Sequence, residues 1–100
     1  MENKNITVEL NENGSGKLVA VEDGIEMGFM EIGKGESNVT AYHTEVLPAG
    51  EGKGWGKQLF KALVEYARSN KLTITPLCPF VHAQLKRGKD EFKDVWAGIE

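Results

Sequence analysis

The first half of the chain alternates short apolar runs with turn-forming residues. Four runs, ITVELN, KLVAVEDG, IEMGFMEIG and SNVTAYHTEV, hold β-branched or alternating apolar residues and are separated by Asn, Gly, Asp and Ser. Such alternation is typical of strands with one buried face. The pattern predicts an antiparallel meander of four strands, over residues 5–9, 16–22, 25–32 and 37–46.

The period changes near residue 48. From Gly54 to Ser69 the apolar positions fall at helical spacing, with one stripe made of Trp55, Leu59, Leu63 and Ala67 and widened by Phe60 and Val64. This spacing predicts an amphipathic helix over residues 54–69, and Asn70 is a suitable residue to end it.

Shorter elements follow this helix. The run KLTIT, residues 71–75, predicts a fifth strand that Pro76 ends, and a second helix is predicted from Pro79 to Gly88 because proline suits the first helical position. The tail DEFKDVWAGIE is expected to form a short helix or an edge segment that places Trp96 on the core.

Composition limits the class of protein. A chain of 100 residues with 40% hydrophobic and 27% charged residues fits a single domain, residues 1–100, with one modest core. The net charge of −3 and the pI of about 5.4 give no overall electrostatic case for a nucleic-acid partner. The apolar runs are short and the start MENKNITVEL lacks a signal-peptide pattern, so we expect a soluble cytoplasmic protein without a membrane partner.

A glycine-rich loop precedes the first helix. In PAGEGKGWGKQLF, residues 48–60, every second residue from Gly50 to Gly56 is glycine. The dinucleotide pattern G-x-G-x-x-G fails in both registers, and the Walker A pattern fails because Glu51 stands where it requires glycine. What remains is a glycine turn at a helix N-terminus, which can hold an anion, with Lys53 and Lys57 adding positive charge. A plain strand-to-helix turn that binds nothing explains the same residues.

The loop and the order of elements resemble the GNAT superfamily of acetyl-CoA-dependent N-acetyltransferases. That family's pyrophosphate loop reads Gln/Arg-x-x-Gly-x-Gly/Ala, and residues 51–56 match it at Gly54 and Gly56 but carry Glu51 at its first position. The likeness is closer to a small single-domain GNAT-like group, through His-Thr-Glu-Val at residues 43–46 and Leu-Cys-Pro-Phe at residues 77–80. The resemblance spans residues 5–96.

The resemblance implies an α/β (α+β) fold, with a mainly antiparallel five-stranded sheet and two principal helices. The sheet would splay between its fourth and fifth strands to admit the pantetheine arm of acetyl-CoA. The residues implied in cofactor contact are Val46 and Leu47 for the arm, Gly52, Lys53, Gly54, Trp55, Gly56 and Lys57 for the pyrophosphate, and Cys78 with Pro79 near the acetyl end. The family's helices between the first two strands cannot fit in NENGSG, which leaves the acceptor site open or completed by another chain.

Three residues are candidates for catalysis. Cys78 directly precedes the second predicted helix, whose dipole favours the thiolate, so it is a candidate nucleophile; a buried, inert cysteine is the alternative. His43 and Glu45 lie two apart on a predicted strand and share one face, with Thr44 on the other. Either could act as a base, and histidine suits neutral pH, although a packing role explains a strand histidine equally well.

The remaining titratable residues add little. His82, one helical turn beyond Cys78, could contact the thiol or lie on a solvated surface. No metal site is expected, because His43, Cys78 and His82 lack closely spaced ligand pairs.

These residues predict acetyl transfer from acetyl-CoA to an amine acceptor, either directly or through an acetyl-Cys78 intermediate. A non-catalytic acyl-CoA-binding or interaction module is the alternative. The protein is expected to be a monomer or a weak homodimer.

Overall fold

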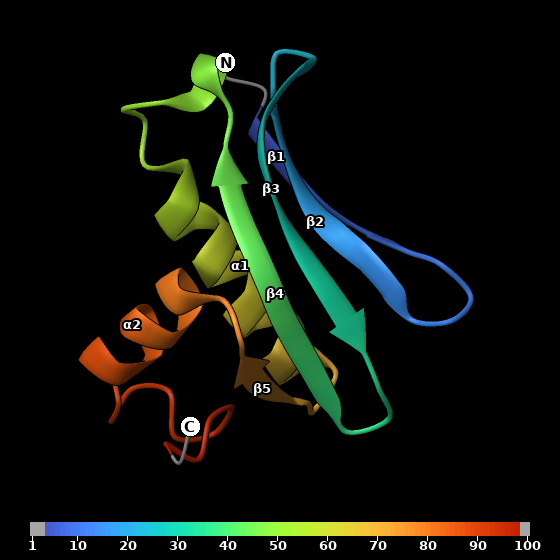
Figure 1. Cartoon of the computed structure of the whole chain (residues 1–100), viewed down its shortest axis with the longest axis vertical. Helices are drawn as coiled ribbons and strands as arrows, with labels where there is room; N and C mark the ends of the chain where they lie inside the picture. The colour runs from blue at the N-terminus through green and yellow to red at the C-terminus, as the bar shows by residue number, and fades with distance from the viewer. Residues whose placement is uncertain (1–3, 99–100) are drawn as a thin grey trace.

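The computed structural model describes residues 4–98, which form five strands and two main helices (Figure 1). In chain order these are β1 (Lys4–Leu10), β2 (Ser15–Glu22), β3 (Ile25–Lys34), β4 (Asn38–Val46), the 3-10 turn η1 (Pro48–Gly50), α1 (Trp55–Ser69), β5 (Thr73–Pro76) and α2 (Pro79–Arg87). Each predicted strand and helix is confirmed, with bounds that differ by no more than about two residues. The turn η1 was not predicted.

The five strands form one mixed sheet in the order β1-β2-β3-β4-β5. The first four strands are antiparallel neighbours, but β5 runs parallel to β4, so the prediction of a mainly antiparallel sheet is corrected at this edge. The physical reason is α1, which crosses over between β4 and β5 and returns the chain to the end of the sheet where β4 began.

The parallel pairing is short. Only Asn38–Ala41 of β4 pairs with Thr73–Pro76 of β5. After Pro76 the chain turns, because Leu77 N–H donates to the carbonyl of Thr75 (3.2 Å), and the N–H of Cys78 donates to the carbonyl of Ala41 instead (2.8 Å). Beyond Ala41 the strand β4 therefore continues with β3 as its only strand neighbour among the described residues.

The segments around β5 differ in detail from the prediction. The strand begins two residues late because Lys71 takes a left-handed conformation (φ 56°) and Leu72 N–H still bonds to Ala67 O (2.8 Å) at the helix end. The tail forms turns rather than a helix. It lies along the sheet edge, where Ile74 N–H donates to Val95 O (2.7 Å), and Trp96 is buried as predicted. Residues 99–100 of the predicted tail lie outside the described residues.

Both helices pack on one face of the sheet (Figure 1). The buried residues of α1 are the predicted stripe: Trp55, Leu59, Phe60, Leu63, Val64 and Ala67. They share one core cluster with sheet residues such as Leu18 and Met30 and with Val81 and Leu85 of α2. Within residues 4–98 no helix covers the other face of the sheet. Neither helix has the length and apolar content needed to cross a membrane.

A β-bulge in β4 changes which way its side chains point. Glu31 pairs with His43 but the next residue, Ile32, pairs with Ala41, so Tyr42 is an extra residue in the ladder. Ala41 is therefore in the core while His43, two residues later, lies on the uncovered face. Alternation resumes after the bulge, which turns Thr44 back toward the helices.

One ion pair ties the tail to α1. Arg68 Nε donates to Asp94 Oδ2 (2.7 Å), and its Nη2 donates to Asp94 Oδ1 (3.3 Å) and to the carbonyl of Glu91 (3.0 Å). This hydrogen bonding lowers the pKa of Asp94, and the carboxylate in turn raises the pKa of Arg68.

Removing a core side chain of α1 tests the packing of the helix on the sheet. Leu63 is fully buried, so Leu63→Ala should lower the free energy of unfolding by about 3 kcal/mol, from lost transfer free energy and a residual cavity. Urea denaturation measures it. Glu65→Ala, an exposed position on the same helix, is the control. A Leu63→Ala loss no larger than the control's would contradict this packing.

The Arg68–Asp94 pair predicts a small pH dependence of stability. Because the folded pKa of Asp94 is lowered, its contribution is complete above the unfolded value of about 3.9 and is lost as pH falls through the folded pKa. Wild type should thus be slightly more stable than Asp94→Asn at pH 7 and should lose that advantage at low pH. Urea midpoints of both proteins at pH 7 and in acid, with Asp90→Asn as control, measure this. A difference that is independent of pH would contradict it.

Candidate functional site

The glycine loop ends at an uncapped helix N-terminus. Gly54, the N-cap of α1, has φ 79° and provides no side-chain cap. The first helical bond runs from Gln58 N–H to Gly54 O (3.2 Å), so the N–H groups of Trp55, Gly56 and Lys57 precede it and have no acceptor within residues 4–98. No acidic residue lies in the first turn. The positive end of a 15-residue helix is thus available to an anion.

The glycines of the loop are required for different physical reasons. Gly52 and Gly54 both have φ 79°, which side chains other than hydrogen rarely tolerate. Gly50 is buried, and a Cβ there would lie 2.5 Å from the carbonyl of Met27. A Cβ on Gly56 would meet the ring of Phe80 at 3.3 Å, so this glycine lets α1 and α2 approach closely. Two glycines thus shape the loop, and two serve packing.

The side chains of the other loop residues point in different directions. Trp55 is buried in the core, and only its backbone can face a ligand at the loop. Lys53 Nζ lies 3.8 Å from Glu22 Oε1 of β2, which turns part of its charge toward the sheet. Lys57 is exposed and lines a groove between the helices. The two lysines therefore lie on different sides of the loop.

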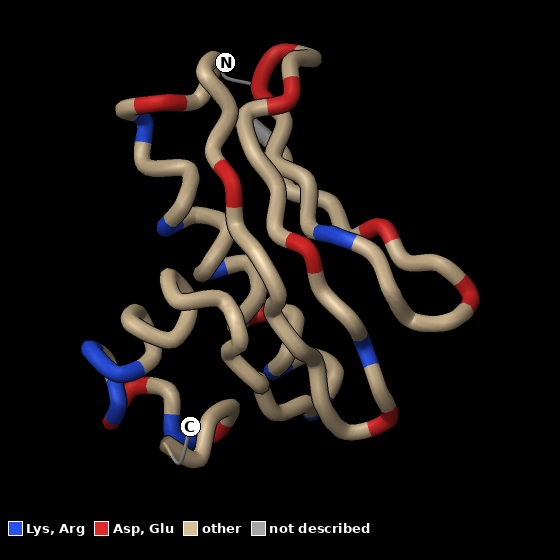
Figure 2. The backbone as a smooth tube through the Cα atoms, in the orientation of Figure 1, with Lys and Arg blue, Asp and Glu red and all other residues tan. Residues whose placement is uncertain are grey.

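This groove runs between α1, α2 and the tail and has a volume of about 550 Å³. Its apolar floor includes Phe60 and Phe92, whose rings meet edge to face at 5.2 Å. Its other lining residues are Lys57, Lys61, Val64, Glu65, Arg68, Gln84, Arg87 and Glu91. Figure 2 shows basic residues along α1 and at the end of α2. The sequence did not single out this groove, because only the helix packing brings its walls together.

The open edge of β4 presents backbone groups beside the helices. Leu47 N–H donates to Met27 O and Leu47 O accepts from Gly50 N–H, both at 2.8 Å, so the backbone of Leu47 is engaged within the fold. Antiparallel pairs alternate, so the bond from Leu47 means that the N–H and C=O groups of Thr44 and Val46 point away from β3. Of the two residues expected to contact the arm, Val46 has its backbone directed to the open edge.

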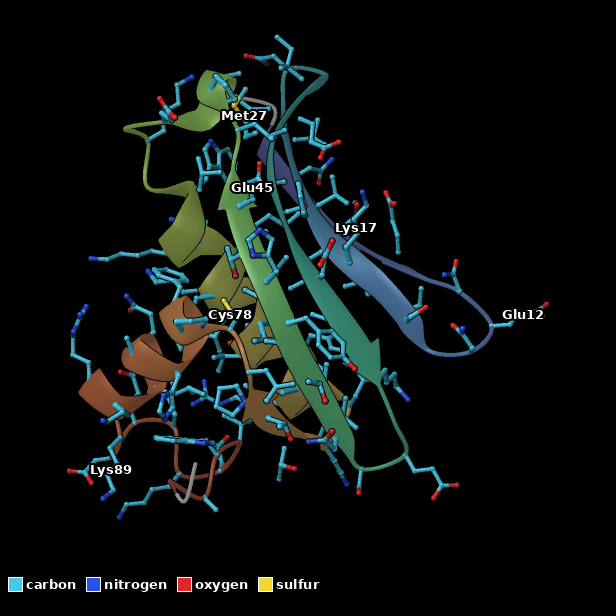
Figure 3. The ribbon with its side chains drawn as sticks, viewed as in Figure 1. Glu12, Lys17, Met27, Glu45, Cys78 and Lys89 are labelled. Atoms are coloured by element: carbon cyan, nitrogen blue, oxygen red, sulfur yellow. The ribbon has the colours of Figure 1, made fainter. Side chains whose placement is uncertain are left out.

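Cys78 lies where the open edge meets α2 (Figure 3). It is the N-cap of α2, directly before the exposed Pro79, and is 3% exposed. Its Sγ lies 3.4 Å from Thr44 Oγ1, within reach of a hydrogen bond, and its carbonyl accepts from His82 N–H (3.0 Å). The predicted position at a helix N-terminus is confirmed. The contact with Thr44 was missed, because it depends on how residues far apart in the sequence pair.

His43 and Glu45 share one face of the sheet, as their spacing predicted, and it is the face opposite the helices. His43 Nε2 and Glu45 Oε1 are 3.3 Å apart, with side chains 55% and 52% exposed. The imidazole also packs at a tilt on Phe29, at 6.4 Å between ring centroids. Because Thr44 points to Cys78, these two groups lie on the side of β4 away from the thiol.

Two further features complete the surroundings. The ring of His82 packs edge to face on Trp96, with centroids 5.8 Å apart. Within residues 4–98 no three His, Cys, Asp or Glu residues gather closely enough to hold a metal ion.

Comparison with known proteins assigns the chain to a family. A family model described as GCN5-related N-acetyl-transferase matches residues 17–95. The chain belongs to this family. Members of the GCN5-related N-acetyltransferases generally use acetyl-CoA as co-substrate. Among solved structures, the chain is similar to a GCN5-like protein from Staphylococcus aureus that is proposed to be an N-acetyltransferase, determined in solution by NMR. The TM-score is 0.66 with 29% sequence identity, over 94% of this chain and 90% of the other. No curated protein matches the chain in sequence.

The loop can be tested with the co-substrate of the GCN5-related family. Gly54 and Gly24 both have φ 79° and open space where a Cβ would stand, but Gly24 lies in the β2–β3 turn. Gly54→Ala and Gly24→Ala should therefore lose similar stability, about 1 kcal/mol. Only Gly54→Ala should weaken CoA binding, by about tenfold, because it alone disturbs the backbone N–H groups at α1. Calorimetric titration measures both affinities. Equal affinity in the two variants would remove the loop from the site.

Proposed function

We propose that this protein binds acetyl-CoA and transfers its acetyl group to an amine, with Cys78 receiving the group first. The observation that carries the proposal is the parting of β4 and β5, which leaves an open strand edge ending at a thiol. The loop at Gly54 lies at the other end of this path. The three parts suit a long ligand with an anionic end and a reactive end.

The basic helical side suits the anionic end of CoA. The free N–H groups at the start of α1 would hold the pyrophosphate, and the groove beyond Lys57 would hold the adenosine with its phosphate. Lys61 and Arg87 supply positive charge there, and Phe60 and Phe92 supply an apolar floor. The pantetheine arm would then follow β4, where the backbone groups of Thr44 and Val46 can bond its amides.

The transfer would proceed in two steps at Cys78. Its sulfur attacks the acetyl carbonyl carbon, the carbon–sulfur bond to CoA breaks, and CoA leaves with a proton as the free thiol. The amine nitrogen then attacks the acetyl-Cys78 carbonyl, forms an amide and releases the cysteine thiol. Thr44 Oγ1, 3.4 Å from the sulfur, is positioned to hydrogen-bond the sulfur in either step.

His43 would serve the amine rather than the thiol. It lies on the uncovered side of β4, from which an acceptor can approach without crossing the helices. If its Nε2–H donates to Glu45 Oε1 (3.3 Å), the other ring nitrogen is free to accept a proton from the ammonium group of the acceptor. The neutral amine then gives its own proton to the leaving sulfur of Cys78. Glu45 then orients the imidazole.

Binding without turnover is a second candidate function. The burial of Cys78, at 3% exposed, favours it, because an inert packing cysteine is buried in the same way. Such a protein would bind acetyl-CoA and leave Cys78 unmodified.

Intact mass separates the two functions. After incubation with acetyl-CoA and no amine, wild type should carry one acetyl group that neutral hydroxylamine removes, as expected for a thioester. Cys78→Ala should carry none, and it has no other cysteine that could take its place. Thr44→Val keeps the side-chain shape and removes the hydroxyl, so acetylation should slow by about tenfold.

The remaining outcomes distinguish the acetyl-Cys78 route from direct transfer and from binding without turnover. His43→Gln should form acetyl-Cys78 normally but pass the group to an added amine more slowly. Full turnover by Cys78→Ala would show direct transfer to the amine. Binding of acetyl-CoA with neither acetylation nor turnover would show the non-catalytic function.

A further inference from the structure

The charge of this protein is divided between its two halves. Residues 4–47, which form β1 to β4, hold three Lys and eight Asp or Glu, a net charge of −5. Residues 48–98 hold nine Lys or Arg and five Asp or Glu, a net charge of +4. Figure 2 shows the acidic residues along the strands and turns of the sheet and the basic residues mainly along the helices. The proposed anionic co-substrate accounts for the basic half only.

The uncovered face of the sheet carries part of the acidic charge in an ordered row. Cross-strand pairing places Glu9, Lys17, Glu31 and His43 opposite one another on β1, β2, β3 and β4. These side chains alternate with core residues such as Leu18 and Ile32, so they point away from the helices. A shallow hollow of about 330 Å³ lies on this row and is lined by Glu9, Lys17 and Glu31 with Leu10, Asn11 and Gly16.

The lysine in this row forms no ion pair, among the described residues, with the glutamates on either side of it. Lys17 Nζ lies over the ring of Phe29, 5.1 Å from its centroid, in a cation–π contact. Glu9 and Glu31 form no ion pair within residues 4–98. The face therefore has two carboxylates that form no ion pair in the described part of the chain, and an aromatic ring that already holds one ammonium group.

We propose that the uncovered face docks a lysine-rich polypeptide segment, which presents the amine that receives the acetyl group. The docking is argued from the charge of the face, and the use of the amine rests on the proposed function. Four strands about 4.8 Å apart make the row about 14 Å long, which matches four or five residues of an extended chain. The hollow is too open to enclose a small amine. The row ends at His43, beside the open edge of β4, so a lysine bound there lies next to the path to Cys78.

Binding of a defined peptide tests the docking without any acetyl transfer. The probe is a fluorescein-labelled 12-residue peptide with lysine at every second position and serine between, and the same peptide with every lysine acetylated is its neutral control. Fluorescence anisotropy at low and high salt gives the affinities. The face variant is Glu9→Gln with Glu31→Gln. The matched control is Asp23→Asn with Glu36→Gln, which removes the same charge from two turns of the same half.

The face variant should bind the lysine peptide at least fivefold more weakly than wild type at low salt, and less so at high salt. The control variant should change by less than twofold. The methyl signals of Val19, which points to this face, should shift on titration with the peptide, while those of Leu59 in the core should not. Both variants should keep wild-type affinity for CoA.

Three outcomes would overturn the proposal: no binding of the lysine peptide by wild type, equal loss in the face and control variants, or competition by spermidine at the peptide's own affinity. The last would assign the face to small amines. Failure of the acetyl-Cys78 experiment would leave these affinities unchanged, so the docking and the proposed function fail separately.

Discussion

The parting of β4 from β5 is the constraint on which the rest of the structure depends. The parallel ladder stops after Pro76 because Leu77 N–H turns back to the carbonyl of Thr75, and Cys78 N–H takes the carbonyl of Ala41 as α2 begins. The remaining length of β4 thus directs backbone groups of Thr44 and Val46 to an edge without a strand. Backbone groups near a core need hydrogen-bond partners. A ligand with its own amides can supply them, and the helix that causes the parting also sets the thiol beside it.

Much of this arrangement could be predicted from local patterns. The stripe from Trp55 to Ala67 predicted α1 and its buried face, and Pro79 predicted the start of α2 with Cys78 as its cap. His43 and Glu45 were placed on one face by a spacing of two. These inferences needed only periodicity and the unpaired groups of a helix end.

The parts that could not be predicted all depend on contacts between distant residues. The Thr44–Cys78 contact needs the pairing of β4 with β5, and the contact of Lys53 with Glu22 needs the packing of the loop against β2. The groove at Phe60 and Phe92 needs the angle between α1 and the tail. The parallel direction of β5 follows from the crossover, which the predicted order of elements contained but the strand pattern alone did not.

The two sides of the sheet can keep separate electrostatic environments. The protein measures 37 × 32 × 23 Å, so charges on its opposite surfaces lie farther apart than the Debye length of about 8 Å at physiological ionic strength, although Lys53 Nζ and Glu22 Oε1 are only 3.8 Å apart. An anion near the helices is largely screened from the carboxylates of the sheet, and a cation near the sheet from the lysines of α1. The sheet and the helices packed on it therefore separate surfaces that attract opposite ions.

The bulge at Tyr42 decides which side chains of β4 face the thiol. Up to Ala41 the odd-numbered residues of β4 face the core, and after the extra residue the even-numbered ones do. A regular ladder that paired Tyr42 with β3 would shift the register by one residue, turning Thr44 outward and the imidazole and carboxylate inward. Loss of Tyr42 would instead leave a regular ladder with both sides unchanged. The register that this bulge sets thus determines which side chains of β4 lie beside the thiol.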